Sequence, residues 1–168
     1  MKTNTSSSGL KKADGDLKVA GRELQTEDPV LDAVCFHLQQ AVEKYLKAFL
    51  AIFLKKIERT HNLEFLIEQC IQIDKDFIEY EEKFDQIAEC GVEVRYPDTF
   101  IIFEDDELVD MMVIIEEFRK FVLEKINIAV RISQSRNKRA FASREAKILI
   151  DETGYFRRKE EKEIINYK

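Results

Sequence analysis

The stretch that decides the fold of this chain is Phe36-His37-Leu38-Gln39-Gln40-Ala41-Val42-Glu43-Lys44-Tyr45-Leu46-Lys47-Ala48-Phe49. Its apolar residues recur with the period of an α-helix and cover a broad face. The polar remainder forms a narrow line, in which His37, Gln40, Lys44 and Lys47 follow one another at helical spacing, with Glu43 beside them. A helix with so wide an apolar face is predicted to lie at the centre of a bundle.

The central helix is predicted to begin at Asp28-Pro29, where a capping carboxylate precedes a proline suited to the first helical position, and to run to about Lys56. Before it we expect a flexible segment over residues 1–9, which lacks apolar periodicity, and a helix over residues 10–24. After it, apolar spacing predicts three more helices, over residues 63–73, 77–90 and 108–131.

Two further segments complete the organisation of the chain. Residues 92–103 contain Pro97 and a short apolar run, and we expect an ordered loop there. Residues 131–168 are predicted to form a weaker helical tail that is interrupted near Thr153-Gly154. The predicted fold class is therefore all-α, an antiparallel up-and-down bundle of four to five main helices over residues 10–130 with an additional helical C-terminal extension over residues 131–168.

Charge is distributed unevenly along the chain. Residues 131–168 contain eleven Lys and Arg against six Asp and Glu, a net charge of +5. The whole chain carries −6, so residues 1–130 carry −11. A basic tail of this kind either contacts the phosphates of RNA or lies as a solvated helix on its own acidic body, and the sequence leaves both interpretations open.

Composition limits the class of protein. The 168 residues are enough for one core, and 45% hydrophobic with 36% charged residues is typical of a helix-rich soluble chain. No apolar run is long enough to span a membrane and the N-terminus lacks the apolar core of a secretory signal, so a cytoplasmic location is expected. The three cysteines, Cys35, Cys70 and Cys90, stand among apolar helical neighbours and are expected to be reduced thiols in or near the core.

Three motifs occur in the order and spacing of a known family. They are the stretch Phe36–Phe49 with its Gln-Gln-Ala-x-Glu-Lys core, the cap Thr60-His61-x-Leu63, and Val94-Arg95-Tyr96-Pro97-Asp98. On these motifs the chain resembles the HEPN family of helical-bundle domains from about Leu10 to Ile128. The resemblance implies an antiparallel bundle that forms a homodimer and works beside a minimal nucleotidyltransferase partner, and many members of the family belong to toxin–antitoxin or other defence systems.

Family members that cleave RNA carry an arginine followed, after four to six residues, by a histidine, and this chain departs from that pattern. Its only histidines are His37 and His61, and fourteen residues separate Arg22 from the first while one separates Arg59 from the second. No histidine follows Arg95 at that spacing either. An imidazole is the side chain suited to acid–base work near neutral pH, so an endoribonuclease toxin of the family type is disfavoured. The Arg-Tyr-Pro-Asp motif resembles that of a non-nucleolytic branch, for which binding of nucleotides or partner proteins is expected.

The candidate binding site combines the polar line with the third motif, which the family fold brings near. It consists of His37, Gln40, Glu43, Lys44, Lys47, Arg95, Tyr96 and Asp98. In such a patch the cations would meet the phosphates of a nucleotide, or acidic groups of a partner, and Tyr96 would stack. The alternative is structural: Glu43 and Lys47 form an ordinary ion pair one turn apart, His37 hydrogen-bonds at a helix junction, and Arg95 fixes its loop.

No metal and no cofactor are expected. Cys35 and His37 are two residues apart on a helix and point away from each other, and Glu104 to Glu107 suit the N-terminus of the next helix better than a magnesium ion. His61 is expected to take part in a helix cap. The function predicted is a non-catalytic interaction module that binds a nucleotidyltransferase-type partner and a nucleotide. The alternatives are an endoribonuclease toxin and an RNA-binding protein that acts through its basic tail.

Overall fold

The computed structural model describes the backbone of residues 2–54, 57–90 and 103–165, and the side chains of residues 6–54, 57–90 and 103–135. These residues contain helices and turns and no strand, so the predicted all-α fold class is confirmed. The chain divides into two compact units, Met1–Ile126 and Asn127–Lys168. The predicted loop over residues 92–103 lies outside the described residues except for Phe103.

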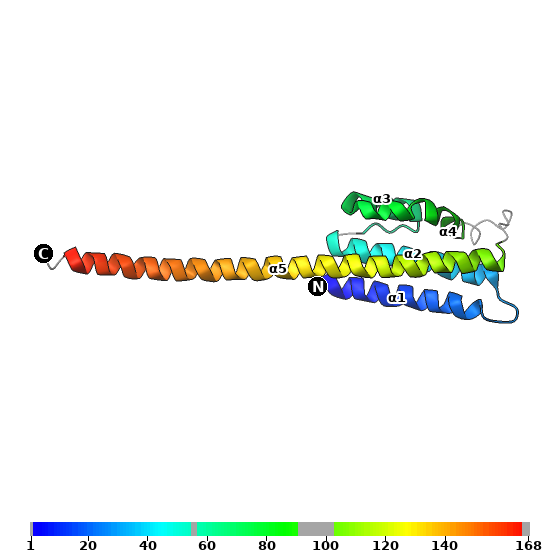
Figure 1. The fold of residues 1–168 in the computed structure, drawn as a ribbon, viewed down its shortest axis with the longest axis horizontal. Helices are drawn as coiled ribbons and strands as arrows, with labels where there is room; N and C mark the ends of the chain where they lie inside the picture. The colour runs from blue at the N-terminus through cyan, green and yellow to red at the C-terminus, as the bar shows by residue number, and fades with distance from the viewer. Residues whose placement is uncertain (1, 55–56, 91–102, 166–168) are drawn as a thin grey trace. The chain divides into compact units, whose positions relative to one another are not determined.

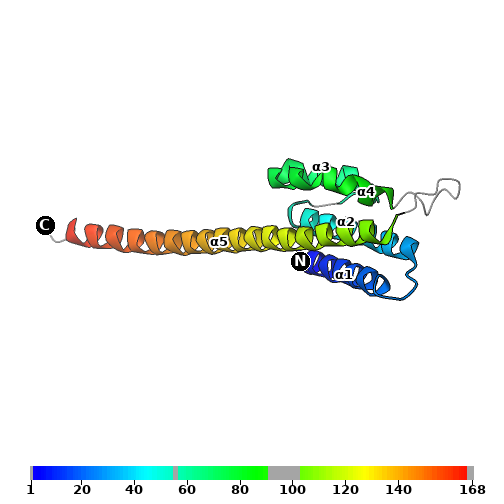
Figure 2. The same ribbon diagram turned by 45° about the vertical axis from the view of Figure 1, so that its right-hand side comes forward.

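The central helix of the first unit is α2 (Leu31–Phe53), which packs against α1 (Lys2–Glu23) and α3 (Leu63–Ile73). Within this unit α1 and α2 lie side by side with the first part of α5 (Asp105–Ile165) (Figures 1 and 2). The central position predicted for this helix is confirmed. Its start is later than expected, with Val30 as the N-cap residue, because the Val30 N–H donates to Glu23 Oε1 at 3.0 Å in a turn that occupies the Asp28-Pro29 region.

Helix α1 begins at Lys2, so the expected flexible segment over residues 1–9 is wrong. Small residues near the start of α1 let this helix approach α2 closely. The Ser6 hydroxyl donates to the Ala48 carbonyl at 2.9 Å, and a Cβ at Gly9 would lie 3.3 Å from the Ala48 Cβ. Close packing of this kind stabilises a helix that has no apolar periodicity of its own.

Helix α3 has the predicted bounds, and its cap is Asn62, whose side chain accepts from the Phe65 N–H at 2.8 Å. The next expected helix, over residues 77–90, is instead two 3-10 helices, η1 (Lys75–Tyr80) and η2 (Glu82–Phe84), followed by the short α4 (Asp85–Glu89). A 3-10 helix places residues three apart above one another, and this brings Phe77 and Tyr80 together against Phe118 and Phe121 of α5. Aromatic packing therefore overrides the α-helical pattern there.

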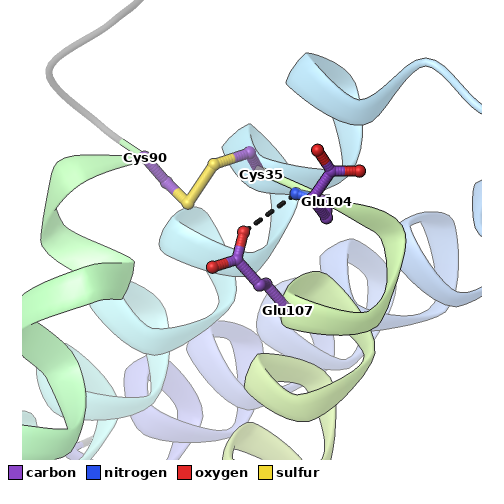
Figure 3. Close-up of a disulfide and its surroundings, with 4 residues drawn as sticks. All are labelled: Cys35, Cys90, Glu104 and Glu107. Atoms are coloured by element: carbon purple, nitrogen blue, oxygen red, sulfur yellow. Dashed lines mark hydrogen bonds between the residues drawn. A yellow bond between two sulfur atoms is a disulfide. The ribbon is translucent and has the colours of Figure 1, made fainter. Parts of the chain in front are cut away.

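Helix α5 begins at Asp105, earlier than the expected start at residue 108, and it continues beyond the expected end near residue 131. Asp105, Asp106 and Glu107, which were expected to precede the helix, therefore form its first turn. The Glu107 carboxylate also accepts from the Glu104 N–H at 2.9 Å, which is half of a capping box (Figure 3). The backbone remains helical through Thr153-Gly154, so the expected interruption is wrong. A single glycine costs a helix only about 1 kcal/mol and does not have to end it.

The cysteines differ from the expectation of three reduced thiols. Cys35 on α2 and Cys90, which follows α4, form a disulfide, with their Cα atoms 5.2 Å apart (Figure 3). Only Cys70 is a free thiol among the described residues, and burial raises its pKa. The sequence shows that each cysteine has apolar neighbours, but it does not show that two of them meet across the bundle.

Candidate functional site

The described part of the candidate site lies along α2, which carries His37, Gln40, Glu43, Lys44 and Lys47. The three remaining candidates, Arg95, Tyr96 and Asp98, lie outside the described residues. The structure therefore tests the arrangement of the polar line itself. It divides into two groups, each built around one carboxylate.

The first group is centred on Asp16 of α1. Its Oδ1 lies 3.0 Å from Nδ1 of His37, and its Oδ2 accepts from Nζ of Lys44. Because a carboxylate oxygen only accepts, the His37 ring carries its proton on Nδ1. The Asp16 side chain is 16% exposed, so this ion pair lies at the junction of α1 and α2 rather than on an open surface.

The second group is centred on Glu43, whose side chain is 5% exposed. Its Oε1 accepts from Nζ of Lys47 at 2.8 Å, and its Oε2 lies 3.0 Å from Nδ1 of His61. Lys47 also donates to the Thr60 carbonyl, which ties the segment before α3 to α2. His61 therefore serves this ion pair, and the expected role in a helix cap is wrong, since Asn62 is the cap.

Two glutamine side chains connect the groups. Gln40 accepts from Lys44 at 3.1 Å and donates to Gln39 at 2.9 Å, and Gln39 donates to the His61 carbonyl at 3.4 Å. The whole set, referred to as the α2 polar network, comprises Asp16, His37, Gln39, Gln40, Glu43, Lys44, Lys47, Thr60 and His61.

The charges of the α2 polar network balance internally. Burial raises the pKa of Glu43, but hydrogen bonds from Lys47 and His61 outweigh it and leave the pKa below its usual range. Each carboxylate pairs with one lysine, Asp16 with Lys44 and Glu43 with Lys47. A phosphate at either lysine would lie close to the carboxylate that already pairs with it, so the network suits hydrogen-bonded recognition better than capture of an anion.

No arginine takes part in the network among the described residues. Both histidines of the chain hydrogen-bond a carboxylate through Nδ1. This arrangement orients the rings, as a carboxylate does for a histidine in many sites. It does not pair either histidine with an arginine among the described residues.

The sequence interpretation missed Asp16 and the role of His61. Asp16 lies on α1, a helix that was predicted from its apolar residues alone. Its partners are more than twenty residues away, on another helix. The register between two helices depends on three-dimensional packing, so a single sequence carries no direct signal for such a pair. The pairing of Glu43 with Lys47 does have a signal in the sequence, because residues four apart are neighbours on a helix. The sequence analysis gave this ion pair as the structural alternative to a binding site.

Comparison with known proteins identifies one family. A family model described as HEPN domain matches residues 7–127, close to the range expected from the three motifs. No curated protein and no solved structure matches the chain. Among the described helices, none is both long enough and apolar enough to cross a membrane.

Proposed function

Because the chain belongs to the HEPN family, we propose that it is a non-catalytic HEPN bundle that acts by binding, as a homodimer that pairs with a nucleotidyltransferase-type protein. The observation that supports binding over catalysis is that the side-chain partners of both histidines are carboxylates, Asp16 and Glu43, and that neither pairs with an arginine in the part of the chain that the structure describes. In RNA-cleaving relatives a histidine works beside an arginine. Here each imidazole is held by an acidic side chain from another part of the bundle.

The surface proposed for the partner protein is the exposed side of the α2 polar network. Lys44 and Lys47 have side chains 26% and 25% exposed, and His61 reaches 63%. Their positions are held by buried or half-buried acceptors, so they offer donors of fixed geometry at small entropic cost on binding. A nucleotide at the same place receives less support, because its phosphates compete with Asp16 and Glu43. A complex of this chain with a nucleotidyltransferase-type protein fits the toxin–antitoxin or defence setting that the family implies.

The test is to search the genes beside this one for a nucleotidyltransferase-type protein and to co-purify that protein with the full chain. We expect a complex with the wild type and a loss of binding with the variant Lys44→Ala/Lys47→Ala. The matched control is Lys75→Ala/Lys120→Ala, which removes the same charge from exposed positions outside the network. Thermal melts establish that both variants are folded. A chain that stays monomeric and fails to bind that protein would contradict the proposal.

A second candidate is RNA binding by the basic tail. Two observations favour it: residues 131–168 carry a net charge of +5, and Asn127–Lys168 forms a compact unit distinct from the acidic first unit. Binding through phosphates weakens steeply as salt rises. This candidate therefore predicts salt-dependent RNA binding that disappears when residues 131–168 are removed, and salt-insensitive binding would exclude it.

A further inference from the structure

The part of the bundle over residues 57–90 is joined to α2 at both of its ends. At the first end, hydrogen bonds of the α2 polar network hold Thr60 and His61, which lie before α3. At the second end the link is covalent, the disulfide between Cys35 and Cys90 (Figure 3). The two links differ in the chemistry that can open them, because a thiol reductant acts only on the second.

The middle of this segment is held by apolar packing that does not need the disulfide. Helix α3 packs against α2, and its buried side chains are Leu63, Leu66, Ile67 and Cys70. Phe84 of η2 packs edge-on against Phe118 of α5, with ring centroids 4.7 Å apart. Helix α3 and the 3-10 helices therefore have anchors of their own.

The last stretch, residues 85–90, has much weaker support. Helix α4 (Asp85–Glu89) is five residues long, and no side chain within the described residues caps its N-terminus. A helix this short is not stable in water without tertiary packing. Of the six residues only Ile87 and Cys90 are buried. The disulfide is therefore a large part of what keeps this stretch on α2.

The two sulfur atoms are covered in the folded protein, because Cys35 and Cys90 are only 3% and 2% exposed. A reductant can reach them only when the structure around them opens. Elements with few buried contacts open locally at a lower free energy than the whole domain. We propose that the Cys35–Cys90 bond is a redox-sensitive switch: a dithiol reductant opens it in the folded protein and releases residues 85–90 from α2, while α3 stays in place.

The reaction transfers two electrons from the dithiol to the disulfide. One thiolate of the reductant attacks one sulfur and forms a mixed disulfide, and the other cysteine leaves as a thiolate that takes up a proton. The second thiol of the reductant, as its thiolate, then displaces the remaining cysteine, which is protonated in turn. The products are two cysteine thiols and the disulfide of the reductant.

The switch lies at the end of the bundle where α5 begins. Figure 3 shows Cys35 and Cys90 beside Glu104 and Glu107, and Glu107 belongs to the first turn of α5. Release of residues 85–90 exposes Ile87, which is fully buried in the oxidised protein. Reduction therefore changes the surface that this end of the bundle presents. The inference goes beyond the proposed function and does not depend on the partner protein.

The experiment is reduction of the oxidised full chain by dithiothreitol without denaturant, with brief pulses of excess N-ethylmaleimide and location of the label by peptide mass spectrometry. Cys70 is the internal control, because it is fully buried on α3 with its Sγ 3.9 Å from the Leu46 carbonyl oxygen. We expect Cys90 to be labelled, and Cys70 to be labelled at least about tenfold more slowly. Failure of reduction without denaturant, or equal rates for Cys90 and Cys70, would overturn the inference.

The dependence of the reduction rate on urea separates local opening from global unfolding. Below the unfolding transition, local opening exposes little surface, so the rate should change by less than about twofold per M urea, whereas global unfolding would raise it by about fivefold or more. A steep dependence would show that the bond is a constraint on the whole fold and would contradict the switch.

The variant Cys35→Ser imitates the open state, because it leaves Cys90 as a permanent thiol. We expect N-ethylmaleimide to label Cys90 of this variant without any reductant, while Cys70 stays protected and shows that the bundle is folded. Protection of Cys90, or labelling of Cys70 together with Cys90, would count against local release of residues 85–90.

Discussion

Glu43 is a carboxylate with 5% of its side chain exposed, and it is stable there because Lys47 and His61 both hydrogen-bond it. A carboxylate that is so little exposed is poorly solvated by water, so it depends on hydrogen bonds from the protein. Removing the charge leaves two donors with a weaker acceptor and loses an ion pair that is shielded from solvent. Glu43 therefore links α2 to the segment before α3 through the hydrogen bonds of its carboxylate rather than through apolar packing.

The first prediction is that Glu43→Gln lowers the free energy of unfolding by about 2 kcal/mol at neutral pH, since hydrogen bonds between charged groups each contribute about 1.5 to 3 kcal/mol. Urea denaturation followed by circular dichroism measures it. The control is Glu79→Gln, which breaks the exposed pair with Lys83 and should cost less than about 1 kcal/mol. Equal losses in the two variants would mean that Glu43 is an ordinary surface acid.

A second prediction concerns acid. The pKa of Glu43 in the folded protein lies below that of an unfolded glutamate, about 4.3. Its stabilising contribution is therefore fully present above the unfolded-state pKa and is lost as the pH falls through the folded-state pKa. Urea midpoints between about pH 6 and pH 3 should fall more steeply for wild type than for Glu43→Gln. The variant keeps the part of the acid dependence that comes from Asp14 and Asp74, whose pKa values are also lowered, and identical slopes would contradict this assignment.

Among the elements, the clearest covalent constraint is the disulfide between Cys35 of α2 and Cys90 after α4. It closes a loop of 55 residues that includes α3 and both 3-10 helices. Closing a loop of this length lowers the entropy of the unfolded chain, which corresponds to about 4 kcal/mol of stability in the chain-entropy account.

The third prediction follows from that constraint. A reducing agent should lower the free energy of unfolding of the wild-type chain by up to about 4 kcal/mol, and it should leave Cys35→Ser/Cys90→Ser unchanged. Urea denaturation with and without reductant measures this, and mass spectrometry counts the free thiols. One free thiol per oxidised chain is expected from Cys70, whereas three would show that the bond does not form.

The sequence was most informative about elements whose signals are local. α3 has its predicted bounds because an apolar repeat follows a capping asparagine, and the acidic turn of α5 follows from the charge of a helix N-terminus. It was least informative where packing decides. The first turns of α1 depend on the fit of Ser6 and Gly9 against Ala48, and the 3-10 helices depend on aromatic contacts with α5.

The candidate site shows the same division. The spacing of the polar line and the pairing of Glu43 with Lys47 could be predicted from helix geometry. The contacts of Asp16 with His37 and Lys44 could not, because they depend on how α1 and α2 are aligned. The acidic partners determine how available the lysines are to a ligand. The sequence therefore identified the residues of the polar line, but it did not show which carboxylates pair with its lysines.

For the whole molecule, the fourth prediction concerns self-association. Val109 and Val113 of α5 are 48% and 53% exposed and lie one helical turn apart on the same face. We expect the proposed homodimer to bury them, and the double substitution Val109→Glu/Val113→Glu to convert a dimer into a monomer. Light scattering coupled to gel filtration measures the mass of both proteins. The exposed pair Val19→Glu/Ile78→Glu, on α1 and η1, is the control, and a dimer that survives both changes would place its interface elsewhere.

The central claim is that this HEPN protein binds without cleaving RNA, and its most direct test is incubation of the purified full chain with a mixed RNA pool. Wild type, Arg95→Ala and His61→Ala are compared over the same time course. We expect RNA decay at the background rate in all three, because His37 and His61 are the only histidines of the chain and neither follows an arginine at the spacing of the RNA-cleaving pair. Cleavage by the wild type that is abolished in Arg95→Ala would contradict it and would identify the protein as a nuclease.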